Sequence, residues 1–242
     1  EHPAGLRRPS NWSIVDETGL CGISLYFPEF TESNTWRDSS YARLAYQLHL
    51  QVNNDGGQYE LAPGYHRMCL GRFQAALKLT EKTGNKLPEE FGRRVESMYD
   101  YLMWLMKPDG SQPSLSDTRP SNLKGTLLQG AHRFDRDDLL YLGSGGEEGR
   151  RPDGTSHLLP DAGYAVMRSG WEPDARYLLL DGGPVGIGHQ HEDKLAILLS
   201  AYGEHFLVDT GPFVYNVSKW RRHAMSTAAH STALIDGQDQ NR

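Results

Sequence analysis

The spacing of apolar residues changes near residue 150, and this change limits the folds open to the chain. Before it, apolar side chains recur at helical spacing over residues 35–52, 65–84 and 87–106. After it come short β-type runs bounded by Gly, Pro or Asp, at residues 162–170, 175–183, 194–202 and 205–211. The sequence therefore predicts a helical part, residues 1–150, followed by a β part, residues 151–242.

The expected helices carry end signals. Pro88 followed by two acids is typical of a helix N-terminus, and Gly84 lies where a helix commonly ends. The third helical segment places its apolar residues three or four apart, at Phe91, Val95, Met98, Leu102 and Leu105.

The β part is expected to be incomplete. Gly203-Glu204 is a plausible hairpin turn, and residues 230–240 resemble a further strand followed by a turn. Four or five strands with apolar residues on both faces would leave unpaired edges and an uncovered sheet. We therefore expect a fragment of a longer protein.

Composition excludes several classes of protein. A formal net charge of −6 argues against tight non-specific binding to nucleic acid, although a local site for an anion stays open. No apolar run approaches the ~20 residues that span a bilayer, and the first twelve residues lack the apolar segment of a secretory signal. Cys21 and Cys69 are expected to be buried free thiols.

The stretch GIGHQHEDK holds His189, His191 and Asp193 at alternate positions. In an extended strand such side chains share one face, so both imidazoles could point at one ligand. The alternative is a polar strand edge whose histidines are merely solvated.

Asp209 and His230 also have two interpretations each. Asp209 follows an apolar run and could simply form a turn, and His230 could be a hydrogen-bonded structural residue. With His191 they would give two nitrogens and one oxygen, a set suited to zinc.

Tyr65 and His66 follow Pro63-Gly64 at the expected start of a helix. Tyr65 could be a packing residue, or a phenol that exchanges protons, with a pKa lowered by the helix N-terminus. Asn11 precedes an apolar segment and is a fair helix N-cap.

Together these features resemble the heparinase II/III-like polysaccharide lyases. Four stretches carry the resemblance: NWSIVDETGLCGISLYFPEF, NNDGGQYELAPGYHRM, GHQHEDKLAILLSAYGEHFLVDTGPFVY and RRHAMSTAAHSTALIDGQDQ. The resemblance implies an α+β multidomain fold, an incomplete α/α toroid followed by a truncated antiparallel β-sandwich, with a substrate cleft between them. It also implies β-elimination in uronic-acid polysaccharides, in the periplasm or outside the cell.

The resemblance assigns catalytic roles. Asn11, supported by a histidine, grips the uronate carboxylate. Tyr65 serves as acid and, for one C5 configuration, also as base. His189 acts as base or helps neutralise the carboxylate, and His66 is an active-site partner. Many relatives have His where this chain has Trp12, although Asn-Trp occurs among heparin-sulfate-type relatives.

The resemblance also implies a structural metal, zinc by its ligands, at His191, Asp209 and His230. His191 then faces the metal while His189 faces the sugar, so this segment should depart from a regular strand.

Further residues are candidates for substrate contact. Arg221 and Arg222 could pair with carboxylates or sulfates, although surface arginines are commoner. Glu60 and Asp117 lie on loops near the expected cleft, where both could support the active-site residues. Glu60 is also a candidate for substrate binding.

Three functions compete. The first is a lyase for acidic glycans, with heparin or heparan sulfate favoured over alginate. The second is a glycan-binding relative without turnover, and the third is a hydrolase with paired carboxylates. Asn11, Tyr65 and His189 favour the first, and nothing in the sequence indicates an oligomeric state.

Overall fold

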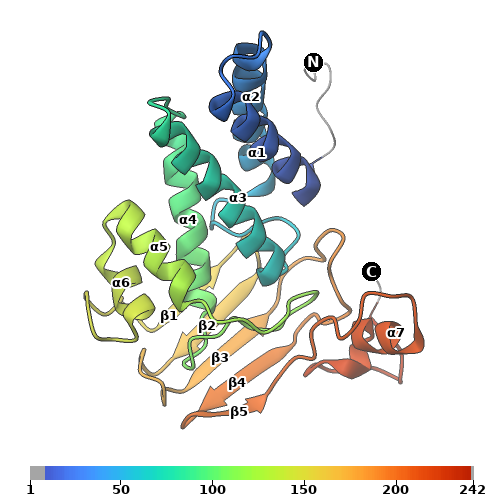
Figure 1. Cartoon of the computed structure of the whole chain (residues 1–242). Helices are drawn as coiled ribbons and strands as arrows, with labels where there is room; N and C mark the ends of the chain where they lie inside the picture. The colour runs from blue at the N-terminus through green and yellow to red at the C-terminus, as the bar shows by residue number, and fades with distance from the viewer. Residues whose placement is uncertain (1–8, 241–242) are drawn as a thin grey trace.

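The computed structural model describes residues 9–240 and places a helical part against a single antiparallel sheet (Figure 1). Residues 1–8, most of the segment expected to lack a secretory signal, lie outside the described residues. The helices are α1 (Asn11–Tyr26), α2 (Ser33–Gln51), α3 (Pro63–Lys82), α4 (Glu89–Leu105), α5 (Lys124–Phe134), α6 (Asp137–Ser144) and α7 (Lys219–Met225). The strands are β1 (Ser156–Leu159), β2 (Tyr164–Arg168), β3 (Tyr177–Asp181), β4 (Ile197–Ala201) and β5 (Glu204–Leu207).

The helices begin and end where local chemistry allows. Pro63 opens α3, and Gly84, just beyond its end, has a φ of 72° as expected. The N-cap of α1 is Ser10, whose side chain accepts a hydrogen bond from the Ser13 amide. The expectation that Asn11 caps this helix was wrong. Asn11 is instead the first helical residue, so its amide side chain is available for other contacts.

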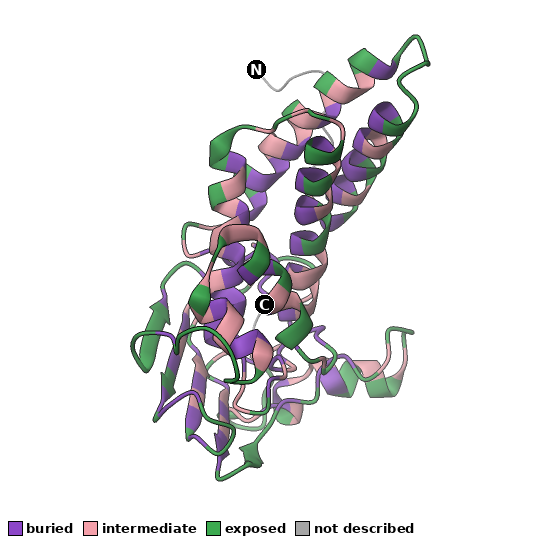
Figure 2. Cartoon of the chain, turned by 60° about the vertical axis from the view of Figure 1, so that its left-hand side comes forward, coloured by how far each residue is buried: buried purple, intermediate pink, exposed green. Residues whose placement is uncertain are grey.

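The core runs along the helical part and continues to the inner face of the sheet (Figure 2). All five apolar residues predicted to line the third helical segment are buried in α4. Cys21 and Cys69 are buried free thiols, as predicted. Among residues 9–240, no helix is both long enough and apolar enough to cross a membrane.

The sheet is a meander in the order β1-β2-β3-β4-β5, with every neighbouring pair antiparallel. Buried and partly exposed residues alternate along β3, as a strand with one covered face requires. Tyr164 pairs with Asp181 and Val166 with Leu179, so buried residues stand opposite one another across β2 and β3.

Two expectations for the β part were wrong. The β4–β5 turn is centred on Tyr202-Gly203, one residue earlier than expected, and both have positive φ, as a type I′ turn requires. Residues 230–240 form turns and a single bridge between Ile235 and Gln238 instead of a strand.

Polar side chains fix the sheet to the end of α4. Arg168 donates to the carbonyls of Trp104 and Met106, and the Tyr177 hydroxyl donates to that of Leu105. These carbonyls lack partners inside the helix, so the sheet satisfies groups that would otherwise be buried unpaired. The loops around the helix ends are thereby held beside the sheet.

Candidate active site

Three loops meet between the helices and the sheet: residues 52–62, 106–123 and 182–196. The Gln190 amide nitrogen donates to the carbonyls of Glu60 and Leu61, both at 3.1 Å, and to Ser116 Oγ at 2.9 Å. These contacts join the three loops into one unit.

Two non-glycine residues in these loops have a left-handed backbone. Leu61 has a φ of 54° and Ser116 a φ of 53°. Such conformations cost of order 1–3 kcal/mol each and persist where the surroundings over-determine them. Leu61 follows Glu60 and Ser116 precedes Asp117, so each strained position is the chain neighbour of a carboxylate of the site.

Tyr65 and His189 stack face to face, with ring centroids 3.5 Å apart and planes 14° from parallel. Tyr65 comes from the first turn of α3 and His189 from the loop between β3 and β4. As expected, the segment holding His189 and His191 is not a regular strand. About a quarter of the His189 side chain is exposed (24%), so this imidazole is open to a ligand.

Asn11 adjoins this stack through Glu60. The Asn11 amide nitrogen lies 3.1 Å from each carboxylate oxygen of Glu60, and Glu60 Oε2 lies 3.6 Å from His189 Nε2. Asn11 and Glu60 are both buried. The structure therefore brings Asn11, Tyr65, His189 and Glu60 together.

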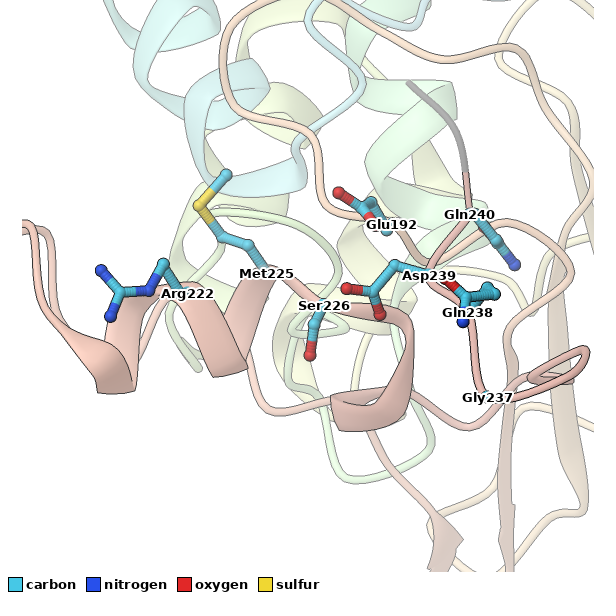
Figure 3. A pocket seen from close by; sticks show the side chains of 8 residues that line it. All are labelled: Glu192, Arg222, Met225, Ser226, Gly237, Gln238, Asp239 and Gln240. Atoms are coloured by element: carbon cyan, nitrogen blue, oxygen red, sulfur yellow. The ribbon is translucent and has the colours of Figure 1, made fainter.

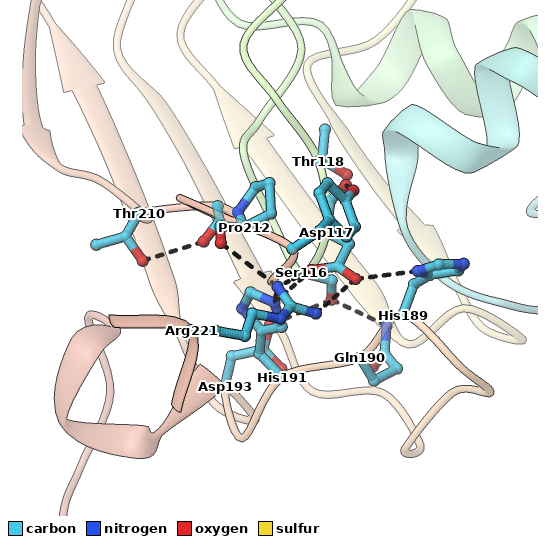
Figure 4. Close-up of polar contacts among 12 residues, drawn as sticks. Ser116, Asp117, Thr118, His189, Gln190, His191, Asp193, Thr210, Pro212 and Arg221 are labelled. Atoms are coloured by element: carbon cyan, nitrogen blue, oxygen red, sulfur yellow. Dashed lines mark hydrogen bonds and ion pairs between the residues drawn. The ribbon is translucent and has the colours of Figure 1, made fainter. Parts of the chain in front are cut away.

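The Asp117 carboxylate is almost fully buried. Figure 4 shows it between His189 and Arg221. It lies 3.0 Å from His189 Nδ1 and 2.9 Å from His191 Nε2, and it accepts two hydrogen bonds from the Arg221 guanidinium. Burial acts to raise the pKa of Asp117, but the bonds from these three residues outweigh it and hold the pKa well below its usual range. Arg221 is therefore the counterion of Asp117.

The pKa of Tyr65 is raised, not lowered as expected. Burial is the main cause, followed by a hydrogen bond with Tyr215 and by the nearby carboxylates of Asp117 and Glu60. These effects outweigh that of the α3 N-terminus. Tyr65 is therefore a protonated phenol at neutral pH.

His66 does not share this surface. Its side chain is fully buried, its Nδ1 accepts from the Gln58 amide at 3.2 Å, and its Nε2 lies 3.0 Å from the Met98 carbonyl. Burial lowers the pKa of His66 to about 3, so the ring is neutral. The expected active-site partner instead fixes the loop before α3 to α4.

His191, Asp209 and His230 form a second, buried cluster. Their ligand atoms lie within 4.8 Å of one another, and His230 Nδ1 lies 2.7 Å from Asp209 Oδ2. Among the described residues, His191 Nδ1 and His230 Nε2 are buried and without a hydrogen-bond partner. Lone pairs in such positions fit a bound cation, so these residues suit a metal.

Arg222 and Asp193 lie outside both clusters. Arg222 is exposed and lines a separate hollow of about 680 Å³ (Figure 3), together with Glu192, Met225, Ser226, Gly237, Gln238, Asp239 and Gln240. Asp193, expected to extend the row of histidines, accepts from Ser116 Oγ and lies 3.7 Å from Lys194 Nζ.

The sequence reasoning missed two residues near the stack. The Tyr215 hydroxyl donates to the Asp117 carbonyl, and Arg119 and Arg221 lie over the Tyr215 ring, at 5.9 and 5.3 Å from its centroid. Arg119 is exposed. Neither residue stands in a pattern that marks it as part of a site.

Two helix N-termini adjoin the site. Asn11 and Tyr65 both lie in the first turn of a helix, α1 and α3. Helix N-termini carry partial positive charge and unpaired amides. Two helix ends therefore add partial positive charge beside the carboxylates of Glu60 and Asp117.

Comparisons with known proteins show the family of the chain. Residues 5–141 match the family profile "Heparinase II/III N-terminus", and residues 151–242 match "Heparinase II/III-like, C-terminal". The chain is 30% identical to a heparin-sulfate lyase of Bacteroides stercoris over 95% of its own length and 36% of the relative's. For the heparin-sulfate lyase of Pedobacter heparinus the values are 30%, 91% and 35%.

The solved heparan sulfate lyase of Pedobacter heparinus superposes with a TM-score of 0.85 and 27% identity, over 96% of this chain and 38% of that one. The predicted fold, part of an α/α toroid followed by part of an antiparallel β-sandwich, is thereby confirmed. The chain spans about a third of the length of the curated relatives it matches, which fits the prediction of a fragment. By its matches to both family profiles, the chain belongs to the heparinase II/III family.

Proposed function

We propose that this chain carries active-site residues of a polysaccharide lyase that cleaves heparin or heparan sulfate by β-elimination. The observation that carries the proposal is the stack of Tyr65 on His189, with Asn11 and Glu60 adjoining. The relatives named as heparin-sulfate lyases supply the substrate class.

The reaction needs an acid, a base and a way to hold the uronate carboxylate. The C5 proton of a uronate is weakly acidic while that carboxylate is ionised, so charge that develops on abstraction must be stabilised. Asn11 and the two helix N-termini would hold the carboxylate. A base then takes the C5 proton, a C4–C5 double bond forms, and the C4–O4 bond breaks as an acid protonates O4.

The environments of the two rings favour one assignment of the acid and base roles. The raised pKa of Tyr65 keeps its phenol protonated, which suits the acid that donates to the leaving O4. His189 is the partly exposed imidazole beside it, which suits the base that removes the C5 proton. The contact of the two rings supports a role for both groups at one sugar.

The carboxylates do not favour glycoside hydrolysis. That reaction requires a carboxylic acid that holds its proton near neutral pH. Asp117 is held ionised by Arg221, and Glu60 accepts from Asn11. Tyr65 is therefore the better proton donor.

We propose a structural role for the buried cluster of His191, Asp209 and His230. A divalent metal, zinc by the choice of ligands, would be held there and would stabilise the fold by linking three separate segments. No step of the elimination passes through it. A periplasmic or extracellular location follows for an enzyme whose substrates are polymers.

The proposal is tested by mixing a full-length protein containing this chain with heparan sulfate, hyaluronan and alginate. Elimination creates a C4–C5 double bond with ultraviolet absorbance, whereas hydrolysis and binding do not. We expect the signal with heparan sulfate. New reducing ends without absorbance would indicate a hydrolase, and binding without either signal would indicate a non-catalytic relative.

A further inference from the structure

We propose that an exposed aromatic patch beside the reaction surface binds a sulfated sugar of the glycan, outside the place where the bond is cleaved. The aromatic patch consists of Phe213, Tyr215 and Trp220, with Lys219 beside them. The inference rests on the proposed lyase function for its catalytic consequence. Binding itself is measured without turnover, so the two can fail separately.

Two large side chains of the aromatic patch are mostly exposed. Phe213 is 65% exposed and Trp220 is 55% exposed, and their ring centroids lie 6.2 Å apart. Single exposed apolar residues are ordinary on a protein surface, but adjoining ones commonly mark a binding site. The loop before α7 and α7 itself project from the side of the molecule in both views (Figure 1; Figure 2). The pair of rings is therefore accessible to a large ligand.

The backbone holds Phe213 in place. Phe213 has a φ of 51°, a left-handed conformation that is unfavourable for a residue with a side chain. Directly before it, the Pro212 carbonyl accepts a hydrogen bond from Arg221 at 3.4 Å. A Cβ at Gly211 would lie 2.6 Å from the Thr118 carbonyl oxygen, so the loop lies directly against its neighbour. An exposed ring on a strained and fixed backbone is typical of a binding residue.

Tyr215 connects the aromatic patch to the reaction surface. Its hydroxyl donates to the Asp117 carbonyl at 3.2 Å, and it also forms a hydrogen bond with Tyr65. Phe213 is two residues away, so its Cα lies within about 7 Å of that of Tyr215. Because Tyr65 stacks on His189, the aromatic patch continues the surface proposed for the elimination.

The charges beside the rings suit a sulfated ligand. Lys219 Nζ lies 5.0 Å from the centroid of the Trp220 ring, and the Arg119 guanidinium lies 5.9 Å from that of Tyr215. Both cations are exposed, and neither forms an ion pair with another of residues 9–240. The aromatic patch therefore offers uncompensated positive charge next to apolar rings.

A sulfated sugar matches both features. One face of a pyranose ring carries C–H groups that pack against an aromatic ring, and a sulfate on the same sugar can pair with a lysine or arginine. A neutral sugar would use only the rings, and a free anion would use only the cations. In a sulfated polymer such as the proposed substrate, several sugars lie outside the cleaved bond.

The test uses a full-length protein containing this chain, with Tyr65→Phe to prevent turnover, and heparan sulfate oligosaccharides as the ligand. Trp220→Ala should raise Kd by about 10-fold, as for an aromatic residue at the centre of a binding surface. The matched control is Phe206→Ala, which removes a similarly exposed ring from β5. An unchanged Kd in Trp220→Ala, or equal losses in both variants, would overturn the proposal.

Phe213→Gly separates binding from packing. Glycine adopts a positive φ without strain, so Tm should stay the same or rise while Kd rises by about 10-fold. If the ring instead packs against another part of the full-length polypeptide, Tm should fall. That result would overturn the proposal.

Lys219→Ala separates charge from stacking. It should raise Kd for heparan sulfate by about threefold and leave Kd for the chemically desulfated glycan unchanged, whereas Trp220→Ala should weaken binding of both. Lys82→Ala, at an exposed lysine that ends α3, is the control. An equal effect of Lys219→Ala on both glycans would contradict a sulfated sugar at this position.

In the protein with Tyr65 intact, substitutions in the aromatic patch at Phe213 and Trp220 should raise KM and leave kcat nearly unchanged, because neither ring belongs to the reacting groups. A protein without lyase activity would refute the proposed function. The binding measurements would still decide this inference.

Discussion

Two clusters lie on either side of Asp117, and they differ in exposure. Tyr65 and His189 are partly open to solvent, whereas His191, Asp209 and His230 are buried. His189 and His191 are two residues apart and share one carboxylate. The difference teaches that exposure, not residue type, separates a ring suited to act on a substrate from one suited to hold the fold.

Removing the Tyr65 hydroxyl tests most strongly whether the partly exposed rings act on the substrate. Tyr65→Phe should lower kcat by about 10²- to 10⁴-fold, since an acid that protonates the leaving group contributes that much. The melting temperature should hardly change. The measurement is product absorbance in the full-length protein, with the exposed Tyr202→Phe as control. Retained turnover would remove Tyr65 from its role.

Substitution in the buried cluster should act on stability first. His191→Gln disrupts the contact with Asp117 and removes a proposed metal ligand, so we expect a loss of about 3 kcal/mol in the free energy of unfolding. For a chain of this size that corresponds to a fall of roughly 6–12 °C in Tm. His205→Gln, at a surface pair, is the control. Unchanged Tm and metal content would contradict a structural metal site.

His66 should make the stability depend on pH. Its pKa is lowered from 6.5 to about 3 by burial, so between these values the unfolded chain binds more protons than the folded one. Stability should therefore fall by about 1.4 kcal/mol per pH unit as the pH drops below 6.5.

Urea unfolding at pH 7, 6 and 5 measures this slope. His66→Gln should flatten it, and substitution of the exposed His132 by Gln should not. An identical slope in chains with and without His66 would show that the ring titrates normally.

The smallest expected effect concerns Arg119. It is exposed beside Tyr215, so Arg119→Ala should raise KM for heparan sulfate by about threefold and weaken the dependence of KM on salt. Arg151→Ala, at a distant surface pair with Glu172, is the control. Equal effects in both variants would indicate a general charge effect instead of a local contact.

The sequence predicted the larger elements of the fold because their apolar spacing is regular. The apolar residues of α4 are an example, since all of those named are buried. The shorter α5, α6 and β1 were not predicted individually, because few residues establish a period in so short a segment. The prediction of a strand at residues 230–240 was wrong because an apolar run of three residues does not distinguish a strand from a turn.

The site was only partly predictable. The resemblance pointed to Tyr65, His189 and Asn11, which the structure brings together. Asp117 was predicted only as a supporting residue near the cleft, because in a loop rich in Ser, Asp and Pro a buried aspartate looks like any turn residue. The burial of His66 was not visible because helix position alone does not tell which face meets another helix.

The most direct test of the account is a double-mutant cycle on Tyr65 and His189. If the phenol and the imidazole act as one unit, Tyr65→Phe, His189→Gln and the double variant should all have similarly low kcat, because losing either group stops the elimination. If the fold-losses in kcat of the single variants instead multiply in the double variant, the two rings contribute independently. The central claim, that Tyr65 and His189 act as one catalytic unit, is then wrong.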